Sequence, residues 1–152
     1  MDKKYETIKQ IIDETVKKMG FNFESDLEKL DDENICVNIK ANNEANFLIG
    51  YEGNNLEALQ HVARLLVNKK TQETQPFLVD VNDYRKNRIN FLKDLSYNIA
   101  KKAVSEKAAV TLQPMPAFER RIIHVSLANL DNVSTESIDE GSNRRVVVKA
   151  NQ

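Results

Sequence analysis

The residues best suited to chemistry lie in the segment LQPMPAFERRIIHVSL, residues 112–127. Arg120 and His124 are four positions apart, so they occupy one face of a helix, and Arg121 adjoins them. A guanidinium beside an imidazole can contact a phosphate while the ring stacks or donates a hydrogen bond. The opposing interpretation is that the arginines are only solvated, that Glu119 pairs with one of them, and that His124 packs the helix against a sheet. We favour the phosphate-binding interpretation.

A second candidate site is the turn in LIGYEGNNLEALQ, residues 48–60. Gly50 and Gly53 would expose backbone N–H groups at the start of a helix and let a sugar-phosphate backbone come close. Tyr51 could stack on a base or a ribose. Glu52 would repel a phosphate, and it is equally well explained as an acidic side chain that stabilises a helix N-terminus. The sequence leaves open whether this turn binds nucleic acid or only joins two helices.

The cations are distributed unevenly along the chain. Its formal net charge is −1, yet the first 75 residues hold 10 Lys or Arg against 14 Asp or Glu, whereas residues 76–152 hold 12 against 9. Arginine presents a planar fork that suits phosphates and base edges, so the second half is better equipped for nucleic acid. We expect the additional arginines there to assist the Arg-His pair. The six arginines of this half are Arg85, Arg88, Arg120, Arg121, Arg144 and Arg145.

Other classes of protein fit the sequence poorly. The first 20 residues have no long uncharged apolar core, so we expect a cytoplasmic protein without membrane insertion. Cys36 is the only cysteine, which excludes an intrachain disulfide and indicates a small apolar residue in a strand. There is no Walker loop and no cluster of carboxylates with metal-ligand spacing, and neither Cys36 nor Ser126 has an evident base. We therefore expect no enzyme, no metal and no cofactor, and we interpret His61 as helix surface.

The first half predicts the order α-β-β-α-α-β. Apolar spacing indicates a helix over residues 5–19, and alternation with a turn at DDEN indicates a hairpin. A short helix precedes the glycine turn, and a longer one follows it, with Asn54 or Asn55 as its cap and Glu57 completing a capping box. The apolar face of this longer helix is Leu56, Leu59, Ala63 and Leu66, the hairpin strands are 21–30 and 35–41, and a last strand is 77–81.

The second half predicts the order α-β-α-β-β, and the chain is therefore an α+β protein with domains at 1–81 and 82–152. A long helix covers residues 83–106, a short strand ends at Pro114, and Pro116 can begin another helix. A hairpin follows over VSTESI and RRVVVKA, with a turn at DEGSN. The expected core faces are Ile89, Leu92, Leu95, Ile99 and Ala103 in the long helix and Phe118, Ile122 and Val125 in the other.

These segments resemble two known modules. The glycine turn within α-β-β-α-α-β resembles a type II KH domain, and the Arg-x-x-x-His spacing resembles the domain of that name (R-3-H) in binders of single-stranded nucleic acids. In order, the chain from residue 1 to about 150 resembles the KH plus Arg-x-x-x-His half of the bacterial Jag family, also called KhpB or SpoIIIJ-associated. The motifs YRKNR, LQPMPAFERRIIH and ES-x-x-x-x-S-x-RRVVV carry the resemblance. One departure is that no basic residue lies between the glycines, and we expect a family member that lacks the N-terminal Jag module.

The resemblance implies an RNA-binding regulator linked to cell growth or envelope processes, with single-stranded RNA preferred over DNA. The alternative is an adaptor in which the acidic KH-like half docks a protein, such as a second KH protein; a homodimer is also open. The residues expected to bind nucleic acid are Arg120, Arg121, His124, Arg85, Arg88, Arg145, Gly50, Tyr51 and Gly53.

Overall fold

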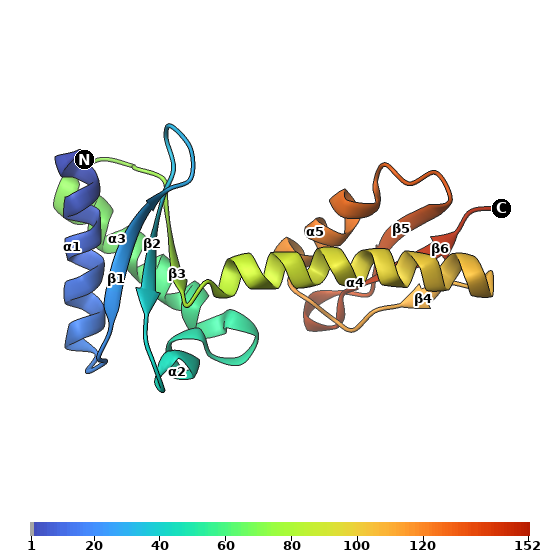
Figure 1. Ribbon diagram of the computed structural model, residues 1–152, viewed down its shortest axis with the longest axis horizontal. Helices are drawn as coiled ribbons and strands as arrows, with labels where there is room; N and C mark the ends of the chain where they lie inside the picture. The colour runs from blue at the N-terminus through green and yellow to red at the C-terminus, as the bar shows by residue number, and fades with distance from the viewer. Residues whose placement is uncertain (1) are drawn as a thin grey trace. The chain divides into compact units, whose positions relative to one another are not determined.

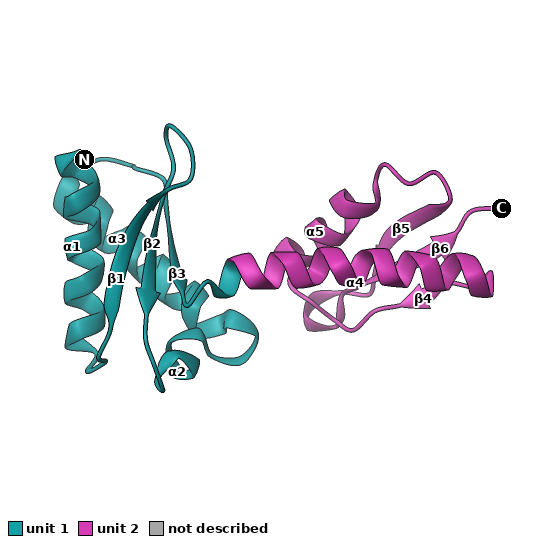
Figure 2. Cartoon of the chain, in the orientation of Figure 1, with its two compact units in different colours: residues 1–85 teal, residues 86–152 magenta. Residues whose placement is uncertain are grey.

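The computed structural model describes residues 2–152, which form two units (Figure 2). The first ends at Arg85 and the second is Lys86–Gln152, so contacts divide the chain four residues after the boundary expected from sequence. Tyr84 packs against the core of the first unit and Arg85 bonds to it, which explains why both group with that unit. No helix within residues 2–152 combines the length and apolar character needed to cross a membrane.

The first unit has the predicted order α-β-β-α-α-β around a three-stranded sheet (Figure 1). Strand β2 lies in the middle, antiparallel to β1 and parallel to β3. Helices α1 and α3 pack against each other and against the sheet, and the core lies between these helices and the sheet. The elements are α1 Lys3–Lys18, β1 Glu24–Lys29, β2 Ile35–Lys40, α2 Ala45–Ile49, the 3-10 turn η1 Tyr51–Gly53, α3 Asn54–Thr71 and β3 Phe77–Val81.

Helix α3 begins differently from the prediction. Gly53 precedes it in the left-handed region, with φ of 80°, and Asn54 is already helical, so no side chain caps the helix. The expected capping box is therefore wrong, and Glu57 instead pairs with Arg85. The expected apolar face is wrong at Leu66, which is exposed, because the helix turns Val67 into the core.

Cys36 is buried in β2, as the sequence predicted. Burial raises the pKa of its thiol to about 11, and the nearby Asp80 carboxylate adds to this shift. A thiol that stays protonated is a poor nucleophile and a poor metal ligand. Cys36 therefore serves as a small apolar side chain.

The second unit has the predicted order α-β-α-β-β, with an antiparallel sheet in the order β4-β6-β5. Its core joins the two helices to β5 and β6. Helix α4 buries Leu92, Ser96, Ala100 and Ala103, so the expected stripe is only partly right. The elements are α4 Tyr84–Glu106, β4 Val110–Thr111, α5 Ala117–Leu127, β5 Val133–Ile138, the 3-10 turn η2 Gly141–Asn143 and β6 Arg145–Ala150.

The apolar face expected for α5 is wrong at Phe118 and Val125, whereas Ile122 is partly buried and packs against the core as expected. Phe118 is 57% exposed and Val125 is 64% exposed, whereas Glu119, Ile123 and Leu127 are buried. The buried residues are also four apart, so the helix is amphipathic as expected but is rotated about its axis. The rotation follows from Glu119, whose carboxylate is held by an arginine of α4.

Candidate nucleic-acid interface

The side chain of His124 extends from α5 toward the edge strand β5, and both of its ring nitrogens contact that strand. Its Nδ1 lies 2.7 Å from Thr135 Oγ1, and its Nε2 lies 2.9 Å from Ser137 Oγ. Thr135 and Ser137 are two apart in a strand, so their side chains share one face. The ring therefore joins α5 to β5, which is the packing role given to His124 by the interpretation that we did not favour from sequence.

Arg120 converges on the same serine. Its Nη1 donates to Ser137 Oγ at 3.4 Å, while its Nε donates to the carbonyl of Met115 at 3.1 Å. The prediction that Arg120 and His124 share one helical face is confirmed, because both reach the hydroxyl of Ser137. Within residues 2–152, Nη2 of Arg120 has no hydrogen-bond partner, so the guanidinium can still donate to a ligand.

The imidazole of His124 is held in its neutral form. Partial burial lowers its pKa from the usual 6.5, and the cations Arg120 and Arg144 lower it further. A neutral ring that donates from Nδ1 to Thr135 and accepts at Nε2 from Ser137 satisfies both contacts. Ser137 then keeps a lone pair for Arg120. The charge available to an anion at this cluster comes from the arginines and not from the imidazole.

The two arginines after the hairpin turn are partly engaged. Arg144 Nη1 donates to the carbonyl of Asp139 at 2.9 Å. Arg145 Nε donates to the carbonyl of Asn143 at 3.0 Å and lies 3.3 Å from the Asp139 carboxylate. The positive charge of Arg144 also lowers the pKa of His124, although its hydrogen bond is to the hairpin turn. Arg145 lies at the hairpin tip with its charge partly offset.

Arg88 is engaged inside the second unit. Its Nε and Nη2 donate to the two oxygens of Glu119 at 2.7 and 3.0 Å, which is a bidentate pair. Glu119 is only 6% exposed, so its carboxylate requires this partner. By contrast, Arg121 is exposed and makes no hydrogen bond or ion pair within residues 2–152. The charge of Arg121 is thus open to a ligand.

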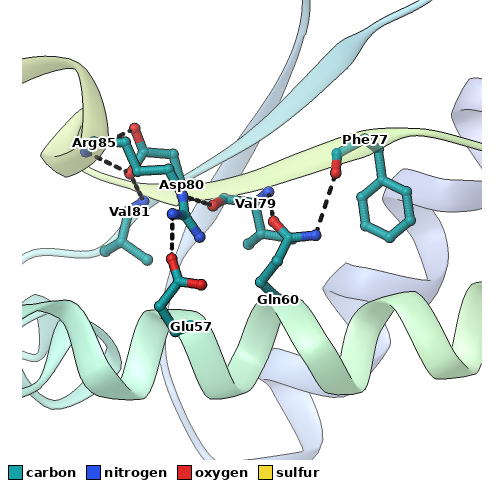
Figure 3. Close-up of polar contacts among 7 residues, drawn as sticks. All are labelled: Glu57, Gln60, Phe77, Val79, Asp80, Val81 and Arg85. Atoms are coloured by element: carbon teal, nitrogen blue, oxygen red, sulfur yellow. Dashed lines mark hydrogen bonds and ion pairs between the residues drawn. The ribbon is translucent and has the colours of Figure 1, made fainter. Parts of the chain in front are cut away.

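Arg85 belongs to the first unit and closes the free edge of β3 (Figure 3). Its Nε donates to the carbonyl of Val79 at 2.9 Å, and its Nη1 pairs with Glu57 at 2.5 Å. The Gln60 side chain donates to the carbonyl of Phe77 at 3.2 Å and accepts from Val79 N at 2.7 Å, as a neighbouring strand would. Asp80 accepts from the backbone N–H groups of Val81 and Arg85.

These side chains explain why Arg85 is not presented to solvent. A sheet edge with unpaired backbone groups invites pairing with another chain, and here side chains satisfy those groups. The carboxyl of Asp80 is buried, which raises its pKa, although the N–H donors act against this shift. Arg85 and Arg88 thus serve structure in their separate units.

The glycines of the turn make close contacts within the protein. A Cβ on Gly50, whose φ is 71°, would lie 2.5 Å from the Asn55 side chain, which donates to the carbonyl of Phe47. A Cβ on Gly53 would lie 3.0 Å from the ring of Tyr84. Both glycines are therefore required by the fold of the turn itself. Tyr51 between them is 80% exposed, so its ring is accessible.

Sequence reasoning missed four polar residues that build these clusters. Thr135 and Ser137 position the Arg-His pair, and Gln60 and Asp80 close the β3 edge. Alternation along the strand 133–138 could have placed the two hydroxyls on one face. Nothing local in the sequence marks Gln60 as the partner of a strand 17 to 19 residues away.

Replacing Gln60 by Leu is expected to lower the free energy of unfolding by about 2–4 kcal/mol, because two buried backbone groups of β3 lose their partner. Urea denaturation measures this difference. The control is Gln10→Leu on an exposed position of α1, which should change stability by less than about 0.5 kcal/mol. Equal losses in the two variants would contradict the edge assignment.

His124 is expected to make stability pH-dependent. The unfolded ring binds a proton near its usual pKa of 6.5, whereas the folded ring binds it only at lower pH. Between the folded and the unfolded pKa, the unfolded state therefore binds more protons. The contribution of His124 to the free energy of unfolding is fully present above pH 6.5 and is lost as the pH falls through the folded pKa.

Urea titrations between about pH 5.5 and 8, on either side of the unperturbed histidine pKa, measure this slope. His124→Gln should flatten it, because glutamine can bond to a hydroxyl without titrating. The control His61→Gln changes an exposed residue of α3 and should leave the slope as in the parent. The same slope in the parent and in His124→Gln would refute the role given to this ring.

Comparison with known proteins places the second unit in a family. Residues 90–150 match the model of the R-3-H (Arg-x-x-x-His) domain. Proteins named RNA-binding protein KhpB are similar to the chain: that of Clostridium symbiosum is 34% identical over 147 residues, covering 97% of this chain and 64% of the relative. The KhpB of Lactiplantibacillus plantarum is 39% identical over 101 residues, covering 66% of this chain and 31% of the relative.

The KhpB of Bacillus subtilis is 35% identical over 106 residues, covering 68% of this chain and 51% of the relative. The chain thus spans less than two thirds of the length of these curated relatives. The matched regions, the order of the elements in both units and the Arg-x-x-x-His geometry of α5 agree with one another. The chain belongs to the KhpB (Jag) family, and residues 90–150 are its R-3-H domain.

Proposed function

We propose that the chain binds single-stranded RNA through its R-3-H unit and acts as a cytoplasmic regulator rather than as an enzyme. The observation that carries the proposal is the convergence of Arg120 and His124 on the hydroxyl of Ser137, with the charge of Arg144 near enough to lower the pKa of His124. This cluster lies in a unit, residues 86–152, that holds 11 Lys or Arg against 7 Asp or Glu. The names of the relatives and the R-3-H match support RNA as the ligand.

Binding fits the cluster better than catalysis does. Ser137 and His124 have the spacing of a nucleophile and its base, but the other ring nitrogen contacts the hydroxyl of Thr135 where hydrolases place a carboxylate. Arg120 and Arg144 disfavour the imidazolium that a general base would become. The same two cations attract a phosphate, so the cluster suits an anionic ligand that is bound without reacting.

The second candidate function is protein docking by the first unit, and the exposed apolar surface of that unit favours it. A groove of about 280 Å³ lies between α1, α2 and α3, lined by residues that include Met19, Phe47 and Val62. These three side chains are exposed, and apolar surface of this kind is typical of interaction sites. A second KH protein or a second copy of the chain are the occupants that we propose for it.

Fluorescence anisotropy of a labelled single-stranded RNA, titrated with the protein at about 50 and 200 mM salt, tests the contribution of the R-3-H unit. If Arg120, Arg121 and Arg144 each contact one phosphate, affinity should fall roughly 20-fold between the two salt concentrations. Arg121→Ala should weaken binding and reduce the salt slope by about 0.7, because one phosphate contact is lost. The double variant Arg120→Ala, His124→Ala should weaken binding further.

The control for these variants is Arg64→Ala, which removes an exposed cation from α3 and should leave the salt slope unchanged. Circular dichroism establishes that each variant is folded. A folded double variant that binds RNA as tightly as the parent would overturn the assignment of the site.

The glycine turn is proposed as a secondary RNA contact through Tyr51 and the backbone of Gly50 and Gly53. Replacing Glu52 by Lys should then tighten RNA binding by roughly two- to fivefold at low salt, because a repulsive charge becomes attractive. Glu33→Lys, which makes the same charge change in the β1–β2 hairpin, measures the nonspecific effect. An affinity gain no larger than that of Glu33→Lys would assign the turn to protein docking.

A further inference from the structure

Large apolar side chains are exposed on the outer surface of the R-3-H unit. Phe118 and Val125 of α5 were expected in the core, and Phe91 of α4 is 54% exposed as well. On α5, Phe118, Arg121 and Val125 follow the i, i+3, i+7 spacing of a single helical face. Exposed apolar groups that gather on one surface mark a binding site more often than single ones do. This face is distinct from the one that Arg120 and His124 turn toward β5.

The ion pair between Arg88 and Glu119 joins the two helices that carry these rings. The Cζ atom of Arg88 lies 5.2 Å from the centre of the Phe91 ring, so the guanidinium covers one face of that ring. The same guanidinium holds both oxygens of Glu119, which follows Phe118 in α5. One ion pair therefore joins α4 to α5, and its guanidinium holds the ring of Phe91. A ring held in place loses little conformational entropy when a ligand stacks on it.

We propose that Phe91 and Phe118 are stacking platforms for the bases of single-stranded RNA, with Arg121 contacting the phosphate between them. The inference rests on the function proposed above and names residues for it that lie outside the Ser137 cluster. Aromatic rings beside uncompensated cations are the usual composition of single-strand binding surfaces, because every base has a face that can stack.

The charges on α5 favour RNA over a protein as the occupant. Arg121 stands in the middle of the exposed face, without an ion pair within residues 2–152. Glu119 is the one acidic residue of α5, and it is buried and neutralised by Arg88. A phosphate approaching this face of α5 therefore meets a cation and no exposed carboxylate of that helix.

The first experiment uses a tryptophan as a reporter. The chain has no Trp, so Phe118→Trp gives a single emission signal at the proposed platform. Titration with a mixed-sequence single-stranded RNA of about ten nucleotides, within the usual site size, should quench this emission. Quenching should saturate at the same RNA concentration as the anisotropy of a labelled strand. An abasic strand of the same length should bind more weakly and leave the emission unquenched.

The second experiment separates stacking from charge. Phe91→Ala and Phe118→Ala should each weaken RNA binding roughly tenfold without changing the salt slope, since stacking releases no counterions. Phe118→Tyr should bind like the parent, because it keeps the ring. Tyr97→Ala is the matched control: Tyr97 is an exposed aromatic of α4 six residues beyond Phe91, and its removal should have no effect.

The outcomes distinguish this inference from the function on which it rests. If the parent fails to bind RNA at low salt, both proposals fall. If the parent binds RNA but the two alanine variants match it and the Trp emission does not change, the stacking inference alone is overturned. The exposed face would then be assigned to a protein partner, and the Ser137 cluster would keep its role in binding RNA.

Discussion

The buried carboxylate of Glu119 is the constraint on which the second unit depends. A charge that is 6% exposed needs a partner, and losing the partner of a buried ion pair costs up to about 3–5 kcal/mol. Arg88 supplies both hydrogen bonds, which fixes the rotation of α5 relative to α4. That rotation puts Ile123 and Leu127 in the core and turns His124 toward β5. The arrangement of every candidate binding residue on α5 follows from this one contact.

The first unit uses the same principle at the edge of its sheet. The side chain of Gln60 occupies the place of a neighbouring strand, and Arg85 and Asp80 satisfy the backbone groups that remain. A strand closed in this way is a poor template for further pairing. Any partner of this unit must therefore approach a surface other than the β3 edge, such as the groove between α1, α2 and α3 or the exposed ring of Tyr51.

The sequence predicted what depends on local patterns. The element order was correct in both units, the strand 77–81 was placed to the residue, and the i, i+4 spacing correctly put Arg120 and His124 on one face. Its errors lie where distant residues decide. The face of α5 depends on a pair 31 positions apart, and Glu57 turned from capping a helix to an arginine 28 positions away. Amphipathic spacing predicts that a helix has an apolar face, but the spacing on α5 allows either Phe118 and Val125 or Ile123 and Leu127 to be buried. The burial of Glu119 beside Arg88 determines that Ile123 and Leu127 are the buried pair.

The same long-range contacts sort the arginines into structural and available ones. Arg85 and Arg88 each form an ion pair with a glutamate carboxylate, and Arg145 forms one with Asp139. Arg120 and Arg144 use neutral partners and keep their charge, and Arg121 is exposed. Only an uncompensated cation releases counterions on binding a phosphate, so the electrostatic footprint is smaller than the six arginines suggest. An affinity built from few phosphate contacts needs another source, and the exposed rings of Phe91 and Phe118 are the source that we propose.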